Sequence, residues 1–348
     1  MESAALYPKP ESSPEREEFY RRLHQRSAAP LWEVLGDLIP TRPQPQCVPA
    51  LWPYAELRPL LMEAGKLITA REAARRVLIL ENPGTLGASR ITGSLYAGLQ
   101  LVLPGEDTPT HRHTASALRF VIESRGGYTA VDGERTTMQP SDFIITPSWT
   151  FHDHGNPSSE PVVWLDGLDL PIVNLFDTGF AEHYPGEIQP VTRAEGDALL
   201  RYGSNMLPVD YKPGCMSTPI FCYPYSRSRE TLEHLYRNGP VDARDGVKMQ
   251  YINPSTGGSP MPAIAAFLQL LPSGFQGQPY RSTEATVFCV AEGTGVSRIG
   301  GKSFEWRSHD IFVVPSWQPI SHAAREDSIL FSFSDRPAQQ ALGLWREE

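Results

Sequence analysis

The stretch that decides the fold runs from Pro104 to Asn156; it begins PGEDTPTHRHTASALRF and ends DFIITPSWTFHDHGN. His111 and His113 are two residues apart, and side chains two apart on a β-strand point to the same side. The segment 142–149 predicts a buried strand closed by a Pro-Ser turn, after which His152 can return to the same cavity. Three neutral imidazoles around one ion suit a first-row divalent metal and leave positions open. We therefore expect His111, His113 and His152 to bind a metal.

The spacing of glycines and prolines around these histidines strengthens the metal hypothesis. Taken alone, a His-x-His pair on a strand is most often polar surface. Here the pair lies between Gly105 and Gly126-Gly127, and His152 lies between Pro147 and Asn156. This arrangement resembles the paired motifs of the cupin family, small antiparallel β-barrels with a metal in the mouth. Many cupins add a glutamate four or five residues after the second histidine, where this chain has Ala117 and Leu118. The expected site is thus three histidines without a carboxylate.

The composition excludes several classes of protein. Apolar residues make up 40% and charged residues 20% of the chain, as in soluble globular proteins. The 33 prolines and 28 glycines favour turns and short strands. A formal net charge of −9 argues against nucleic acid as a partner. Four scattered cysteines without a CxxC motif favour reduced thiols. With no signal segment and no long apolar run, we expect a soluble, cytoplasmic protein without a membrane partner.

Composition shifts along the chain predict four segments. In order, we expect an N-terminal helical arm, a metal-binding barrel, an inter-barrel linker and a second barrel without metal ligands, at residues 1–90, 91–185, 186–260 and 261–340. Within the arm, Ser13-Pro14 with acidic residues after it predicts a helix start. Further helical pieces are expected near 31–38, 54–65, 193–201 and 229–237. Asp132-Gly133 predicts a hairpin turn.

An internal repeat predicts that the two barrels are of the same type. The segments 142–149 and 310–317 match at an offset of 168 residues, and without a gap this offset also brings Phe120 onto Phe288. The expected fold is therefore dominated by β-structure: a bicupin of two jelly-roll barrels, with a helical arm and helical linker segments. The same offset carries the three histidines onto Pro279, Arg281 and Ile320. We therefore expect one metal per chain, with His322 as a lone polar residue lining the second barrel.

Three further polar residues lie close to the histidines in sequence. Arg119 either contacts an anion inside the barrel or forms an exterior ion pair, because an unpaired buried charge is costly. His154 shares the strand face of His152, so it is a candidate proton relay or hydrogen-bond donor, with exposed surface as the alternative. Asp166 follows an apolar strand; it either accepts the free N–H of His154 or of a ligand imidazole, or is an ordinary turn residue.

The segments THRHTASALRFVIE, PSWTFHDHGN, WLDGLDLP and RRVLILENPG together resemble the gentisate 1,2-dioxygenases and the related salicylate and 1-hydroxy-2-naphthoate dioxygenases. The resemblance covers most of the chain. It implies a homotetramer with one Fe(II) per chain, held by the three histidines in the N-terminal barrel. It also implies catalytic roles for His154 and Asp166, and substrate-binding roles for four residues: Arg119, Arg75, Gln100 and Tyr96.

The activity implied by this resemblance is ring cleavage by dioxygen. Both oxygen atoms would enter gentisate (2,5-dihydroxybenzoate) between its carboxyl-bearing and hydroxyl-bearing carbons, giving maleylpyruvate. Tyr96 stands where family members differ between tyrosine and tryptophan, and tyrosine is more typical of the gentisate enzymes. The alternatives are a salicylate or 1-hydroxy-2-naphthoate 1,2-dioxygenase, a manganese cupin isomerase or decarboxylase, and a non-enzymatic bicupin for storage or ligand binding.

Overall fold

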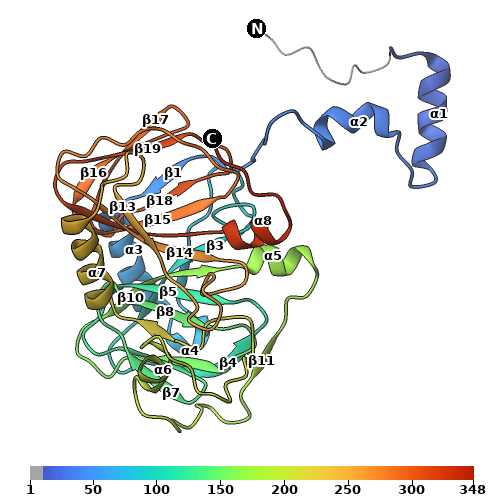
Figure 1. Cartoon of the computed structure of the whole chain (residues 1–348). Coiled ribbons are helices and arrows are strands. Elements are labelled where there is room, and N and C mark those ends of the chain that lie inside the picture. Colours follow the sequence, from blue (N-terminus) through green and yellow to red (C-terminus); the bar gives the residue numbers. More distant parts are fainter. Residues whose placement is uncertain (1–10) are drawn as a thin grey trace. The chain divides into compact units, whose positions relative to one another are not determined.

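The structure, a computed structural model, describes residues 11–348 (Figure 1). The chain forms two compact units, one ending at Pro45 and the other running from Gln46 to Glu348. The helices are α1 Pro14–His24, α2 Leu31–Leu38, α3 Tyr54–Leu67, α4 Ala70–Ala73, α5 Leu170–Leu175, α6 Asp197–Tyr202, α7 Tyr225–Asn238 and α8 Arg336–Ala341. None of the helices within residues 11–348 combines the length and apolar character needed to cross a bilayer.

The first unit contains α1 and α2, both at predicted positions. The side chain of Ser13 accepts a hydrogen bond from the backbone N–H of Arg16 and caps α1, and Pro14 occupies the first turn. The two helices are joined by side chains: Tyr20 donates to Glu33 at 2.7 Å, and the Trp32 indole donates to the Tyr20 hydroxyl at 2.9 Å. The predicted helix start at Ser13-Pro14 is confirmed.

Two sheets form the first barrel, and the strands within each sheet pair antiparallel. The six-stranded sheet has the order β12-β8-β5-β10-β3-β2, with bounds Cys222–Tyr223, Phe143–Thr146, Ala117–Glu123, Val162–Leu168, Tyr96–Val102 and Val77–Ile79. The five-stranded sheet has the order β11-β4-β9-β6-β7, with bounds Ala181–His183, Asp107–His113, His152–Gly155, Tyr128–Val131 and Glu134–Thr137. The predicted turn joins β6 to β7, with positive φ at both Asp132 and Gly133, as a tight hairpin requires.

The second barrel repeats this plan. Its six-stranded sheet has the order β1-β18-β15-β20-β14-β13, with bounds Ala50–Trp52, Ile311–Val314, Thr286–Glu292, Ser328–Ser334, Ala265–Leu271 and Val247–Gln250. Its smaller sheet has the order β17-β16-β19, with bounds Lys302–Arg307, Thr294–Ile299 and Ile320–Ala324. The expectation of a β-dominated bicupin is confirmed.

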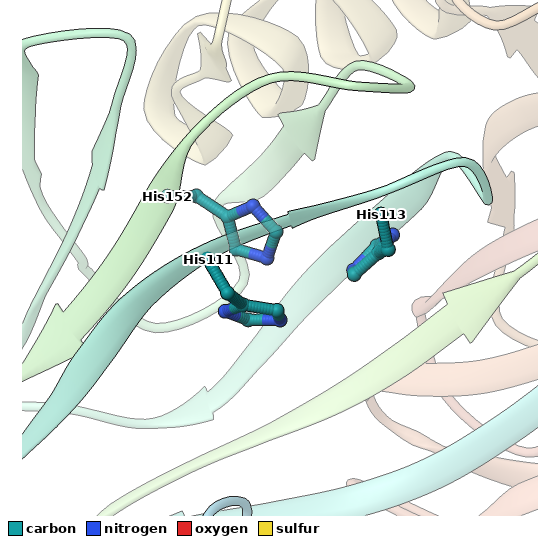
Figure 2. A group of neighbouring side chains, drawn as sticks. All are labelled: His111, His113 and His152. Carbon is teal, nitrogen blue, oxygen red and sulfur yellow. The ribbon is translucent and has the colours of Figure 1, made fainter. Parts of the chain in front are cut away.

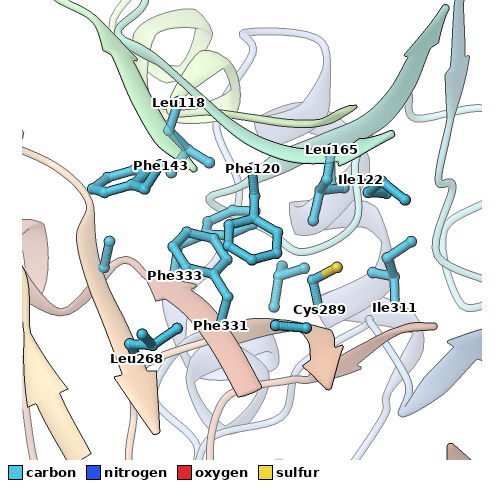
Figure 3. Close-up of a cluster of buried hydrophobic side chains, with 14 of the residues drawn as sticks. Leu118, Phe120, Ile122, Phe143, Leu165, Leu268, Cys289, Ile311, Phe331 and Phe333 are labelled. Atoms are coloured by element: carbon cyan, nitrogen blue, oxygen red, sulfur yellow. The ribbon is translucent and has the colours of Figure 1, made fainter. Parts of the chain in front are cut away.

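One apolar core joins the two six-stranded sheets (Figure 3). Leu118 and Phe120 of β5 face this core, whereas Arg119, which lies between them in the strand, faces the interior of the first barrel. The rings of Phe120 and Phe331 stack with centroids 4.2 Å apart and planes 8° from parallel. The core therefore holds the barrels back to back. The interior of each barrel is lined by the side chains on the opposite faces of its strands.

Each barrel also takes up a strand from outside its own segment, and the helix that follows this strand begins against the same barrel before it packs on the other one. Strand β1 comes before the first barrel in sequence but pairs with β18 of the second, and β12 pairs with β8 of the first. The helices that follow them begin alike, because the N–H of Tyr54 donates to Asp310 at 2.9 Å and that of Tyr225 to Asp142 at 2.8 Å. Residues 46–90 and 186–260 are thus partly built into the sheets, and the predicted four-segment division stays a prediction.

The structure corrects the alignment of the two barrels by one residue in β4 and β5. His111 lies opposite His152, and Tyr280 lies opposite Ile320. The carbonyl of His113 accepts from the N–H of Trp149 at 2.8 Å, as that of Ser282 accepts from Trp317 at 2.7 Å. The counterparts of the three histidines are therefore Tyr280, Ser282 and Ile320, not Pro279, Arg281 and Ile320.

The same correction applies to the next strand. Arg119 pairs with Ile144, and Phe288 pairs with Phe312 at the equivalent place, so Arg119 rather than Phe120 corresponds to Phe288. A gap-free comparison misses this because the second barrel has one residue fewer between equivalent positions of β15 and β16 than the first barrel has between those of β5 and β6. The conclusion that the second barrel has no histidine cluster is unaffected.

Candidate metal centre

Three imidazole rings meet inside the first barrel (Figure 2). His111 and His113 lie on β4, and His152 opens the neighbouring strand β9. Their ring centroids are 4.3 to 5.3 Å apart, and one nitrogen of each ring lies within 4.8 Å of one in each of the others. Among residues 11–348 no other group of three histidine, cysteine or acidic side chains is arranged in this way. The predicted trio is therefore brought together.

Hydrogen bonds from the rings orient the nitrogens. Nδ1 of His113 donates to the Ala115 carbonyl at 2.7 Å, and Nδ1 of His152 donates to the Thr150 carbonyl at 2.9 Å. A carbonyl can only accept, so these two rings carry their proton on Nδ1 and leave Nε2 with a free lone pair. These two bonds leave Nε2 as the ligand atom of His113 and His152. For His111, the Pro109 carbonyl is a nearby acceptor, and Arg75 also contacts Nδ1.

Burial keeps these rings neutral at physiological pH. Loss of solvent is the main cause that lowers the pKa of His111 to about 3, and the charge of Arg75 lowers it further. The pKa of His113 and that of His152 are lowered as well, again first by burial and then by nearby charges that include Arg119. Since only neutral imidazole binds a metal, no proton has to leave before an ion enters.

Arg119 lies inside the barrel, and the exterior alternative is wrong. Its side chain is only 3% exposed. One terminal nitrogen donates to Thr146 Oγ1 at 2.6 Å, and the other donates to Nε2 of His154 at 3.2 Å. The third nitrogen, Nε, has no hydrogen-bond partner, with Asp166 Oδ1 3.7 Å away. A buried, unused donor of a charged group is suited to an anionic ligand.

His154 is buried, so the surface alternative is also wrong. Its Nδ1 lies 3.0 Å from the hydroxyl of Thr129. Because guanidinium has only donors, Nε2 accepts from Arg119 and the proton of His154 belongs on Nδ1. The free N–H of this ring thus goes to Thr129. The expectation that Asp166 takes it is wrong.

Asp166 takes its hydrogen bond from a neighbour on its own strand instead. The indole N–H of Trp164 donates to Asp166 Oδ1 at 2.8 Å, and both residues face the barrel interior along β10. Burial raises the pKa of Asp166 to about 6, and the charge of Arg119 opposes that rise. The carboxylate is therefore not an ordinary turn residue, but is poised to change its charge near neutral pH.

The three remaining candidates line the same interior. Arg75 donates to the Pro109 carbonyl at 2.9 Å and contacts Nδ1 of His111. Its neighbour Arg76 is instead bound to Glu106 by two hydrogen bonds of 2.8 Å. On β3, Gln100 is buried with an Nε2 that has no partner.

Tyr96 lies on the same face of β3 as Gln100, because four residues on a strand restore the side-chain direction. Burial raises the pKa of its phenol, and the charge of Asp166 raises it further, so the hydroxyl keeps its proton. A Cβ added to Gly98, between them, would lie 3.1 Å from the Tyr96 hydroxyl. The absence of a side chain at Gly98 thus leaves room for this ring.

Sequence reasoning missed the partners that fix these groups: Thr129, Thr146 and Trp164. One of them left a signal. Thr129 and His154 correspond to Ser297 and His322 at the repeat offset, and the second pair is also bonded, at 2.8 Å. A hydroxyl-histidine pair kept in both halves was therefore visible in the sequence.

Comparisons with known proteins agree with this geometry. A cupin domain model matches residues 98–168. Gentisate 1,2-dioxygenase 1 of Aquipseudomonas alcaligenes is 60% identical over 97% of this chain and 98% of its own length. A 1-hydroxy-2-naphthoate 1,2-dioxygenase of Nocardioides sp. is 33% identical over 88% of this chain and 80% of its own.

A solved structure is similar to this chain over nearly its whole length. Salicylate 1,2-dioxygenase from Pseudoaminobacter salicylatoxidans, in adducts with gentisate, superposes with a TM-score of 0.93 at 32% identity and covers 99% of this chain and 96% of its own. The similarity therefore extends over both barrels rather than the histidine-bearing one alone. This chain belongs to the gentisate 1,2-dioxygenase family of cupin proteins.

Proposed function

We propose that this protein is a gentisate 1,2-dioxygenase that cleaves the ring between the carboxyl-bearing and hydroxyl-bearing carbons and releases maleylpyruvate. The observation that carries the proposal is the meeting of three neutral imidazoles beside two cationic side chains, Arg75 and Arg119. This combination offers a metal and a counter-charge for a carboxylate in one buried space. The 60% identical relative carries the name of the same activity.

Fe(II) is the proposed metal, one per chain, held by Nε2 of His111, His113 and His152. A donor set of three imidazoles suits a first-row divalent ion, and no carboxylate from positions 117 or 118 joins it, since Leu118 packs into the core between the barrels. Bound there, Fe(II) supplies open positions for a chelating hydroxy acid and for dioxygen, together with the oxygen chemistry itself.

The protein's own part is to hold and orient the substrate. The unused Nε–H of Arg119 and the guanidinium of Arg75 are proposed to bind the substrate carboxylate, and Nε2 of Gln100 to donate to an oxygen of the ring substituents. Charge-assisted bonds of this kind are stronger than neutral ones. Tyr96, with its protonated hydroxyl, is proposed to border the ring.

Proton handling is assigned to His154 and Asp166. In this structure Arg119 occupies Nε2 of His154. A substrate carboxylate that takes that donor would leave Nε2 free to accept the proton of a ring hydroxyl, while Thr129 holds the ring through Nδ1. Asp166 then balances the charge of the arginine, from which it is 3.7 Å away.

A substrate panel tests the proposal. Protein reconstituted with Fe(II) without oxygen is mixed with gentisate, salicylate or 1-hydroxy-2-naphthoate, and oxygen uptake and product absorbance are recorded. We expect one dioxygen consumed per gentisate and the highest kcat/KM for gentisate. Preference for either other acid would reassign the substrate. Uptake that requires manganese would reassign the metal, and tight binding of an aromatic acid without uptake would point to a binding protein.

The family resemblance also predicts a homotetramer in the cytoplasm. Light scattering on a sizing column measures the first, with four chains of 38.7 kDa as the expected mass. Cell fractionation measures the second.

A further inference from the structure

A β-bulge in β4 determines which way the metal-binding histidines point. Thr108 pairs with His154 and His111 pairs with His152, so two residues of β4, Pro109 and Thr110, lie opposite a single residue of β9. Without the extra residue, position 110 would face His152, and both histidines of β4 would turn to the outer side of the barrel, because a one-residue slip inverts every side chain. The bulge is therefore a condition for the site.

The backbone groups of the bulge have hydrogen-bond partners other than β9. These partners come from the segment on the opposite edge of β4 and from Arg75. The N–H of Thr110 donates to the Glu187 carbonyl at 3.0 Å, and its carbonyl accepts from Tyr184 at 3.1 Å. Pro109 has no N–H, and its carbonyl accepts from Arg75. The segment 184–189 thus covers the outer face of the bulge.

The side chains behind the bulge form a buried clamp of three residues: Asp153, Thr110 and Gln189. Oδ2 of Asp153 accepts from the Thr110 hydroxyl at 2.8 Å and from the Gln189 side-chain amide at 2.9 Å. The backbone N–H of Gln189 in turn donates to the Thr110 hydroxyl at 2.8 Å. Asp153 and Thr110 are each 1% exposed and Gln189 is 6% exposed. Every donor of the clamp is therefore used in a space without solvent.

Gln189 extends the clamp to the strands around it. Its Oε1 accepts from the N–H of Gly133 at 3.1 Å, in the turn between β6 and β7, and its Nε2 lies 3.3 Å from the carbonyls of Ala130 and Phe151. One side chain thereby joins the bulge, the strand that carries His152 and the adjacent hairpin.

We propose that Asp153 and Gln189 are positioning residues: they hold the bulge in register from the outer face and thereby direct His111 and His113 toward the metal. The inference rests on the proposed metal site and goes beyond it, because none of the clamp side chains reaches the ion or the substrate. Asp153 stands between two inward-facing histidines and points away from them. The carboxylate of Asp153 therefore does not contribute to the surface of the barrel interior. Its hydrogen bonds go to the bulge and to Gln189.

The test exchanges the two polar groups. Gln189→Glu places a second carboxylate against Asp153, removes a donor and should open the clamp. The double variant D153N/Q189E restores one donor and one acceptor in reversed order. Gln340→Glu, the same change at an exposed position of α8, is the matched control. Fe(II) affinity is measured by chelator competition, ligand geometry by the visible spectrum of the Co(II)-loaded protein, and folding by circular dichroism.

For Q189E we expect Fe(II) affinity to fall by about 10- to 100-fold, as for residues that orient metal ligands, with an altered Co(II) spectrum. D153N/Q189E should recover most of the affinity and the wild-type spectrum, and Q340E should match wild type. If Q189E does not fold, Thr110→Val removes the clamp hydroxyl at nearly constant shape and should give the same spectral change.

Unchanged affinity and spectrum in Q189E, or in Thr110→Val where Q189E is unfolded, would overturn the positioning role. So would a loss that the double variant does not recover. If wild-type protein itself binds no Fe(II) and consumes no oxygen with gentisate, the proposed function fails instead, and the two failures are distinguished in one series.

Discussion

The two barrels of this chain share a scaffold and differ in what fills it. At the places of His111, His113 and His152 the second barrel has Tyr280, Ser282 and Ile320. Arg119 is replaced by Phe288, and Asp166 by Ser332, at the same register positions. The three histidines, the buried arginine and the carboxylate of the first barrel are thus all absent from the equivalent positions of the second, while the strands that carry them are retained.

One element of the site is retained in both barrels. His154 is bonded to Thr129, and His322 to Ser297, with both histidines 1% exposed. Only His154 has a further partner at Nε2, which is Arg119; Nε2 of His322 has none. The hydroxyl-histidine pair therefore belongs to the shared scaffold, and the contact with Arg119 distinguishes the pair in the first barrel.

The largest expected effect comes from the metal ligands. His113→Ala should abolish iron retention and lower gentisate turnover by more than about 100-fold, because loss of a direct ligand exceeds the effect of losing an orienting partner. Ser282→Ala, at the counterpart position, should leave both unchanged. Metal analysis and oxygen uptake measure this. A fully active, iron-replete His113→Ala protein would remove the three-histidine site.

The next effect separates substrate binding from metal binding. Arg119→Ala should lower kcat/KM for gentisate by about 10- to 100-fold, the value of a hydrogen bond to a charged group, with little change in iron content. Phe288→Ala should instead lower the free energy of unfolding by about 3–5 kcal/mol through the cavity it leaves, with no loss of chemistry per folded molecule. Equal loss of iron and turnover in Arg119→Ala would indicate a structural role.

A smaller effect should appear in the pH profile. Asp166, whose pKa burial raises to about 6, is ionised above that pH and protonated below it. If the carboxylate form is required, kcat/KM falls as pH drops below 6, by about tenfold at pH 5. Asp166→Asn should lower the plateau and remove this limb.

Asp169 provides the control for the pH profile. Burial raises the pKa of Asp169 to about 6 as well. This residue, however, stands at the start of α5 and accepts a hydrogen bond from the backbone N–H of Ser116 instead of facing Arg119. Asp169→Asn should therefore keep the acid limb. If Asp169→Asn loses the acid limb and Asp166→Asn keeps it, the titrating carboxylate is Asp169 and not Asp166.

The smallest effect concerns α3 and α7, the helices that follow the exchanged strands β1 and β12. Arg58 binds Glu123 by two hydrogen bonds of 2.6 and 2.9 Å, and Arg229 binds Glu292 at 3.2 Å in the equivalent place. These pairs are partly exposed, so Glu123→Gln and Glu292→Gln should each lower the free energy of unfolding by only about 0.5–1 kcal/mol. Urea denaturation measures both. Loss of iron in Glu123→Gln alone would show that the contact with α3 supports the metal site and not only the stability of the fold.

Local patterns predicted much of the fold. The start of α1 at Ser13-Pro14 and the hairpin at Asp132-Gly133 depend on neighbouring residues, which can be read directly from the sequence. The repeat can be read in the same way, because two segments are compared letter by letter. The exchange of β1 and β12 did not follow, because pairing between distant strands depends on tertiary packing. A signal was nevertheless present: Pro53-Tyr54 with Arg58 recurs as Pro224-Tyr225 with Arg229.

The site was predictable in its parts but not in its contacts. Strand parity placed His111 with His113, yet the bulge that makes this parity useful was not visible, since it depends on the register against β9. The one-residue error at Phe120 and Phe288 has the same origin. The acceptor of His154 was missed because Thr129 comes from a strand 25 residues earlier, and only the recurrence of the pair at Ser297 and His322 pointed to it.

Anomalous diffraction at the iron edge, from crystals of active protein loaded with Fe(II), tests the central claim most directly. A single peak per chain, within bonding distance of Nε2 of His111, His113 and His152, is the predicted result. A peak near Tyr280 and Ser282 in the second barrel, or none in crystals whose dissolved protein consumes oxygen with gentisate, would contradict it.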